Sequence, residues 1–187
     1  MDQDDEREFL ARLKRADEAA FRAVVERYEG QVAATVTGIL GIGPDVDDIG
    51  QETFVKFYRS INRFRGESTI GTYLTRIAIN LSLNELRRRR KIDKLKTPDG
   101  PEGGPGVIRE NHRPSAEDAR VLVRQGLQRL EPKYRTVVVL RLVDGFSTRE
   151  TAEILDLPHG TVLSRLARGQ ARLREILGGE ARERTGS

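Results

Sequence analysis

Residues 147–177 read STRETAEILDLPHGTVLSRLARGQARLREIL, and this stretch decides the fold. Ser147 with Glu150 three residues later is the pattern of a capping box, which predicts the start of a short helix. The run Asp156-Leu157-Pro158 ends that helix, and a second helix is expected from about His159 to the end of the stretch. A short helix, a tight turn and a longer helix together predict a helix-turn-helix.

The second helix of this motif has two chemically different faces. At 100° per residue, an apolar side is separated by about a quarter-turn from a side that bears arginines. The apolar side consists of Val162, Leu166, Leu173 and Ile176. Arginine forks fit guanine edges and phosphates, so this motif predicts binding in the DNA major groove, with a solvated arginine face as the alternative. The candidate DNA contacts of this motif are Arg149, His159, Thr161, Ser164, Arg165, Arg168 and Arg172.

Upstream of the motif, the sequence changes character over residues 97–120. This segment is rich in Pro and Gly and nearly free of large apolar side chains, which predicts a flexible linker. The linker divides the chain into a first domain at residues 1–96 and a second domain at residues 121–178. Residues 179–187 are expected to form a polar tail.

The first domain is also predicted to be helical. Apolar residues recur at i, i+3, i+4 and i+7 in two stretches of it. These stretches are Phe21, Val24, Val25 and Tyr28, and then Leu74, Ile77, Ala78 and Leu81. Between them a helix is expected after Pro44, with Asp45 as its N-cap. The expected fold class is therefore all-α, with two small helical domains joined by a flexible linker.

Composition excludes several classes of protein. The chain has 187 residues, 33 Lys+Arg, 29 Asp+Glu, two histidines and no cysteine, so its formal net charge is +4. Disulfide frameworks and cysteine-ligated zinc are excluded, and His112 and His159 are not in a ligand-spaced cluster. No apolar run reaches the roughly 18 residues of a membrane span, so we expect no membrane insertion and a cytoplasmic location. No cofactor, metal or enzymatic activity is predicted.

Charged and aromatic segments of the first domain allow more than one interpretation. Seven basic residues and one acid occupy residues 87–96, a block that binds polyanions or simply ends a helix favourably. The aromatic and amide side chains nearby are suited to unpaired bases, although the aromatic ones also fit a core. The acidic residues at 45–52 are better explained by helix-start electrostatics or a basic partner than by a metal site.

In this order and spacing, the segments resemble a bacterial RNA polymerase sigma factor of the extracytoplasmic-function (ECF) group. The resemblance is carried by residues 17–28, 47–54, 64–80, 84–90 and 130–166. It implies a promoter-specificity subunit with sigma domain 2 and a helix-turn-helix domain 4 that reads the −35 element. It also implies three partners: core RNA polymerase through the β′ clamp helices and the β flap, promoter DNA, and an anti-sigma factor.

The resemblance assigns roles to individual residues of the first domain. The implied polymerase contacts are Asp47, Asp48, Gln51, Glu52 and Phe54. The implied contacts to the −10 element and its melted strand are Arg63, Arg65, Tyr73, Arg76, Asn80, Asn84, Arg87, Arg88, Arg90 and Lys91. The alternative function is that of a stand-alone helix-turn-helix regulator that binds duplex operator DNA without polymerase.

Overall fold

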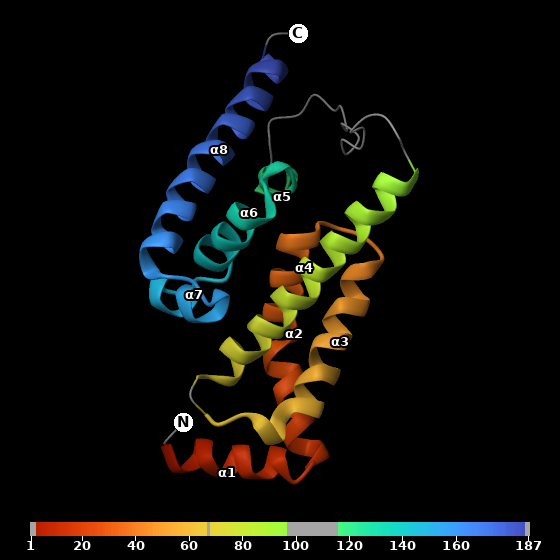
Figure 1. Cartoon of the computed structure of the whole chain (residues 1–187), viewed down its shortest axis with the longest axis vertical. Helices are drawn as coiled ribbons and strands as arrows, with labels where there is room; N and C mark the ends of the chain where they lie inside the picture. The colour runs from red at the N-terminus through yellow and green to blue at the C-terminus, as the bar shows by residue number, and fades with distance from the viewer. Residues whose placement is uncertain (1–2, 67, 97–115, 186–187) are drawn as a thin grey trace.

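The computed structural model describes residues 3–66, 68–96 and 116–185, and every regular element within them is helical (Figure 1). The predicted linker, apart from its last residues, lies outside the described part of the chain. The elements are α1 (Gln3–Lys14), α2 (Glu18–Leu40), α3 (Asp45–Ser60), η1 (Ile61–Arg63), α4 (Ile70–Lys96), α5 (Ala116–Arg129), α6 (Pro132–Val138), η2 (Val139–Val143), α7 (Thr148–Leu155) and α8 (His159–Thr185). The all-α prediction is confirmed.

The N-terminal domain consists of α1 to α4, with α2, α3 and α4 packed along one another and α1 across one end (Figure 1). Asp17 caps α2 by accepting a hydrogen bond from the backbone N–H of Ala20 at 3.0 Å, which satisfies one of the free donors at the helix start. The core contains most of the apolar residues predicted for α2 and α4, together with Phe57 of α3. Val24, Phe57 and Leu74 are each at most 1 % exposed. Burial of these helix faces stabilises the domain through the hydrophobic effect.

The prediction that Asp45 caps α3 is wrong. The N-cap position is occupied by Pro44, which makes no side-chain capping bond, and Asp45 is the first helical residue. Its carboxylate instead accepts a hydrogen bond from the Arg89 guanidinium at 2.8 Å, with Arg88 at 3.9 Å. An ion pair with α4 therefore takes the place of the local cap, and it ties the start of α3 to the end of α4.

The C-terminal domain consists of α5 to α8, in which α8 packs against α5, α6 and α7 (Figure 1). Its core joins Leu127 and Leu130 of the α5 end to Val138 and Val139, with Leu166 of α8 packed against them. The last turn of the α6 helix widens into a π-helical segment, η2, whose first two residues are fully buried. The chain is thus helical from Pro132 to Val143, with a change of helix type at Val139.

Helix bounds differ from the sequence expectation at three places. Helix α1 was not predicted, and its apolar residues Phe9, Leu10 and Leu13 join the core of the N-terminal domain. Helix α5 begins at Ala116, inside the expected linker, and α8 continues to Thr185, through most of the expected tail. Both extensions consist largely of Ala, Glu and Arg, which are good helix formers, and the Gly pair before the second one does not stop the helix.

The two domains pack against each other. A shared apolar cluster joins Ile39 of α2 and Ile79 of α4 to Leu140 of η2 and Ile154 of α7, each at most 4 % exposed. Gly38 allows α2 and η2 to approach closely, because a Cβ atom there would lie 2.9 Å from both methyl carbons of Val139. The helix-turn-helix therefore lies beside α4 in this arrangement (Figure 1).

Candidate nucleic-acid and protein interfaces

The helix-turn-helix forms as the sequence predicts. The backbone N–H of Ser147 donates to the Glu150 carboxylate at 2.7 Å, and the N–H of Glu150 donates to the Ser147 hydroxyl at 3.2 Å, which is a complete capping box. Asp156 ends α7 with a left-handed backbone, φ 52°, so the chain turns sharply into α8. Val162 of α8 is fully buried against the rest of the domain. This geometry leaves the opposite face of α8 exposed.

The predicted major-groove residues fall into three groups. His159, Ser164 and Arg168 are exposed at the start of α8 or along it. Thr161 and Arg165 are half-buried. Two arginines are engaged within the protein: Arg149 pairs with Glu153 at 3.2 Å, and Arg172 pairs with Glu131 at 2.7 Å and lies over the ring of Tyr134. Arg149 and Arg172 stay exposed in spite of these ion pairs, so all the predicted major-groove residues except Thr161 and Arg165 lie at the surface.

The arginine run of α4 divides into two pairs with different environments. Arg88 and Arg89 both bind the Glu85 carboxylate, at 2.6 and 3.1 Å, and reach Asp45 of α3 as well. Glu85 is 9 % exposed, and these hydrogen bonds, from Arg88 foremost, lower the pKa of its carboxyl group. Arg87 and Arg90 instead line a pocket against the C-terminal domain. The run is therefore only in part a free basic surface.

The other predicted −10 residues occupy unequal positions. Exposed positions are held by Arg63, Arg65, Asn80, Asn84 and Lys91. Tyr73 is half-buried: its hydroxyl donates to Ser60 at 3.0 Å and its ring packs near Phe57 and Phe64. Phe64, which is 6 % exposed, belongs to the core, and half-buried Tyr73 packs against it, as the core interpretation expects. Tyr58, in contrast, is 46 % exposed.

Arg76 links the two domains. Its guanidinium donates to the backbone carbonyl of Ile154 at 3.2 Å and to that of Glu153, near the end of α7. The last four carbonyls of a helix have no partner within the helix, so a cation from α4 is favourable there. In the packed arrangement, the C-terminal domain therefore engages Arg76, and its guanidinium is not free to bind a phosphate.

The acidic start of α3 forms a compact exposed surface. Asp47, Asp48 and Gln51 are exposed, and Asp47 and Asp48 have no hydrogen-bond or ion-pair partner among the described residues. Glu52 is half-buried, and Phe54 packs against the core of the N-terminal domain. Next to this surface, Ile42 is 81 % exposed in the turn between α2 and α3. Exposed carboxylates a few residues from an exposed apolar side chain suit a basic protein partner.

Sequence reasoning missed Arg135, which is the polar centre of the domain contact. Its side chain lies in an apolar helix and is 6 % exposed. The guanidinium donates to the carbonyls of Ile39 at 2.6 Å and Leu130 at 2.9 Å, and to both the side chain and the carbonyl of Gln128. Burial, with a smaller repulsion from Arg90, lowers the pKa of Arg135 to about 10. An arginine two residues before the valine run 137–139 is the only sequence signal of this role.

Sequence reasoning also missed a carboxyl group buried between the domains. The hydroxyl of Thr35 in α2 lies 2.8 Å from Oδ2 of Asp144 and 2.9 Å from the carbonyl oxygen of Gln31. Burial raises the pKa of Asp144 from 3.8 to about 6, although the hydrogen bond from Thr35 opposes the shift. When Asp144 is protonated, its carboxyl group donates a hydrogen bond to the Thr35 hydroxyl, and this hydroxyl donates to the carbonyl oxygen of Gln31. Both contacts of the Thr35 hydroxyl are then hydrogen bonds. The structure gives Asp144 no ion pair with any described residue.

We expect domain packing to weaken as the pH rises between 3.8 and about 6, the ordinary and raised pKa values of Asp144. In this window Asp144 is protonated in the packed form and deprotonated in the separated form. The free energy that favours packing therefore decreases by about 2–3 kcal/mol across the window. Small-angle scattering from about pH 3.5 to 7 measures the change as an increasing radius of gyration. Asp144→Asn should flatten the profile, whereas Asp156→Asn in an exposed turn should not; equal profiles for wild type and Asp144→Asn contradict the assignment.

The described residues contain neither a helix that could span a membrane nor a cluster of metal-ligating side chains. No helix there is both long enough and apolar enough to cross a membrane. Nor do those residues contain a group of three or more His, Cys, Asp or Glu side chains that could hold a metal ion.

Comparison with known families matches both domains. The Sigma-70 region 2 profile matches residues 24–92, and the profile described as Sigma-70, region 4 matches residues 120–173. The chain is 35 % identical over 171 residues to the ECF RNA polymerase sigma-E factor of Escherichia coli strain K12, which covers 86 % of this chain and 88 % of the relative. It is 33 % identical over 177 residues to the ECF RNA polymerase sigma factor SigW of Bacillus subtilis strain 168, covering 90 % and 94 %.

Solved structures give the same picture. The chain is similar to CnrH in its complex with the cytosolic domain of CnrY, with a TM-score of 0.68, 28 % identity, and coverage of 92 % of this chain and 97 % of that one. It also shares its fold with the sigma factor RpoE of Bartonella quintana, solved with the anti-sigma factor NepR, with a TM-score of 0.68, 21 % identity, and coverage of 84 % and 96 %.

Proposed function

This chain belongs to the ECF group of RNA polymerase sigma factors, and we propose that it docks on core polymerase through the start of α3 and contacts promoter DNA through α4 and α8. As an ECF sigma factor it directs RNA polymerase to promoters and is a non-catalytic subunit. The observation that supports the proposed surfaces best is their separation by charge. Exposed carboxylates gather at the start of α3, while exposed arginines and amides lie on α4 and α8.

We propose that the β′ clamp helices of the polymerase bind the surface formed by Asp47, Asp48, Gln51, Glu52 and Phe54. The exposed members of this group bind a basic surface directly, and Phe54 acts by fixing α3 to the core. For the C-terminal domain we propose the β flap as the partner. Leu142 and Val143 are 54 % and 50 % exposed there, which supplies an apolar contact area.

Reversing two charges at the start of α3 should disrupt holoenzyme formation. We expect Asp47→Arg combined with Asp48→Arg to weaken binding to core polymerase by about tenfold or more, because like charges then oppose each other at the interface. Fluorescence anisotropy of the labelled chain titrated with core polymerase measures the affinity. The matched control is Glu26→Arg with Glu29→Arg, two exposed positions of α2. Equal affinities for the two double variants would refute the proposed surface.

The proposed −35 contact is tested at Arg168, which is exposed and has no partner among the described residues. Arg168→Ala should lower the promoter affinity of the holoenzyme by about 1–3 kcal/mol if its fork contacts a base edge or an ordered phosphate. Filter binding of holoenzyme to a promoter fragment measures this loss. Arg174→Ala, which removes an exposed arginine from another side of α8, is the control. Wild-type promoter affinity in Arg168→Ala would exclude this face of the helix.

Promoter binding requires the two domains to move apart. Arg87, Arg90 and Arg165, which belong to the −10 and −35 sets, line one pocket in the packed arrangement. Promoter elements on successive turns of DNA lie about 34 Å apart, so residues around one pocket cannot contact both. We propose that the packed form is the resting state of the free chain.

Run-off transcription with core polymerase over genomic templates tests the whole function. The alternative, a stand-alone regulator, requires tight binding to duplex DNA without polymerase.

We also propose an anti-sigma protein as a partner and the cytoplasm as the place of action. The similarity to CnrH, solved with the cytosolic domain of CnrY, supports the first proposal. Copurification of the tagged chain from its native cells, followed by mass spectrometry, identifies such a partner. A partner that inhibits run-off transcription when added to the purified holoenzyme fulfils the proposal.

A further inference from the structure

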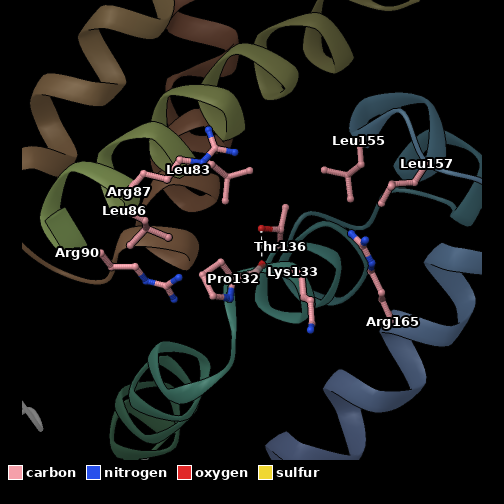
Figure 2. A pocket seen from close by; sticks show the side chains of 10 residues that line it. All are labelled: Leu83, Leu86, Arg87, Arg90, Pro132, Lys133, Thr136, Leu155, Leu157 and Arg165. Atoms are coloured by element: carbon pink, nitrogen blue, oxygen red, sulfur yellow. Dashed lines mark hydrogen bonds between the residues drawn. The ribbon is translucent and has the colours of Figure 1, made fainter. Parts of the chain in front are cut away.

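A pocket with a volume of about 300 Å³ lies between the two domains. Figure 2 shows that side chains of α4 line one side, those of α6 line the base, and those around the α7–α8 turn line the opposite side. Much of the wall is apolar, with Leu83 and Leu86 facing Leu155 and Leu157. The volume is at the lower end of the range for small-molecule sites. Because both domains form it, this pocket exists only when they are packed together.

Four cations surround this apolar wall. Arg87 and Arg90 come from α4, Lys133 from α6 and Arg165 from α8, and no acidic residue lines the pocket (Figure 2). Lys133 is paired with Glu131 at 2.8 Å, and Arg87 donates to the amide oxygen of Asn84 at 2.7 Å. Arg90 and Arg165 have neither a hydrogen bond nor an ion pair with any described residue. Arg90 of the N-terminal domain and Arg165 of the C-terminal domain therefore lack a counter-charge among the described residues.

Domain packing carries an electrostatic cost at this place. Cations of both domains line the same pocket, so their like charges repel when the domains pack. Arg90 also adds to the lowering of the Arg135 pKa, which is caused mainly by burial. A ligand with two negative charges beside an apolar group removes this repulsion and covers the leucine side chains at the same time. Such a ligand binds the packed form and not the separated form, so it shifts the domain equilibrium toward packing.

We propose that this interdomain pocket binds a small anion that combines an apolar group with a phosphate or a comparable doubly charged group. The apolar group lies against the leucine wall, and the charged group is bound by Arg90 and Arg165. Occupancy holds the domains together and engages arginines that the proposed function assigns to DNA. The ligand is therefore an inhibitor of promoter binding that acts on the free sigma factor.

The test is isothermal titration calorimetry of the full chain with 2-naphthyl phosphate, with inorganic triphosphate and neutral 2-naphthol as comparison probes. We expect one site that binds 2-naphthyl phosphate more tightly than either comparison probe. The double variant Arg90→Ala, Arg165→Ala should bind it at least about tenfold more weakly. The control is Arg59→Ala with Arg174→Ala, two exposed arginines outside the pocket, and it should bind as wild type does.

A second variant, Gly38→Leu, keeps all four cations but places a side chain where Val139 packs, and it should lose binding because the pocket needs both domains. Equal weakening in the two arginine double variants overturns the proposal, as does the absence of binding at about 1 mM probe. Triphosphate binding as tightly as 2-naphthyl phosphate overturns the role of the leucine wall. The titration contains neither DNA nor polymerase, so its outcome is independent of the promoter role.

Discussion

Arg135→Ala is expected to lower the free energy of unfolding by about 3 kcal/mol, because it leaves two buried carbonyls and one partly buried carbonyl without their donor. These are the carbonyls of Ile39, Gln128 and Leu130, which end helices in different domains. The guanidinium therefore acts as a shared helix cap as well as an interdomain contact. Urea unfolding followed by circular dichroism measures the change.

Two further variants separate this explanation from a general effect of losing an arginine. Arg135→Lys keeps the charge but lacks the planar fork, so it should recover only part of the lost stability. Arg174→Ala removes an exposed arginine and should change stability by less than about 0.5 kcal/mol. Equal stability of Arg135→Ala and wild type would mean that water satisfies these carbonyls equally well.

Gly38→Leu is expected to separate the two domains while leaving each folded. The first atom of the new side chain already lies within 2.9 Å of both methyl carbons of Val139, and the remaining atoms have no space between α2 and η2. Overpacking costs about 1–3 kcal/mol when a core cannot move, but here the domains avoid this cost by moving apart. Small-angle scattering should show a larger radius of gyration at unchanged helical circular dichroism.

The matched control for this variant lies in the same helix. Gly30→Leu places the same side chain where no atom lies within 4 Å, and it should leave the radius of gyration unchanged. A Gly38→Leu chain with the dimensions of wild type and full helix content would contradict the packed arrangement. Separation also frees Arg76 from the carbonyls of Glu153 and Ile154, so this variant offers DNA a guanidinium that wild type engages internally.

Local patterns were readable from the sequence wherever a helix faces its own domain. The apolar side of α8 and the capping box of α7 are confirmed, since periodicity and capping chemistry depend only on neighbours along the chain. The cap of α3 was mispredicted for the opposite reason. Asp45 has a partner 44 residues away, Arg89, and an ion pair of that separation leaves no local pattern.

Packing between the domains had no readable signal. Ile39 and Leu140 are apolar residues within helical segments, and nothing in their spacing distinguishes contact with another domain from contact with their own. The arginine run shows the same limit for charge. A sequence presents four equivalent arginines, whereas one buried acid, Glu85, binds Arg88 and Arg89 and leaves Arg87 and Arg90 toward the pocket. Which basic residues remain for DNA is thus decided by tertiary structure.

The π-helical segment η2 determines the orientation of the recognition helix α8 relative to the N-terminal domain. A π turn contains one residue more than an α turn, so deleting one residue from Val139–Val143 would restore α-helical geometry. Every element downstream would then rotate by about 100° about the helix axis. Helix α8 is connected to η2 through α7, so the orientation of α8 relative to the N-terminal domain depends on this single extra residue. Deleting one residue from η2 would therefore change the orientation of the helix that contacts the promoter.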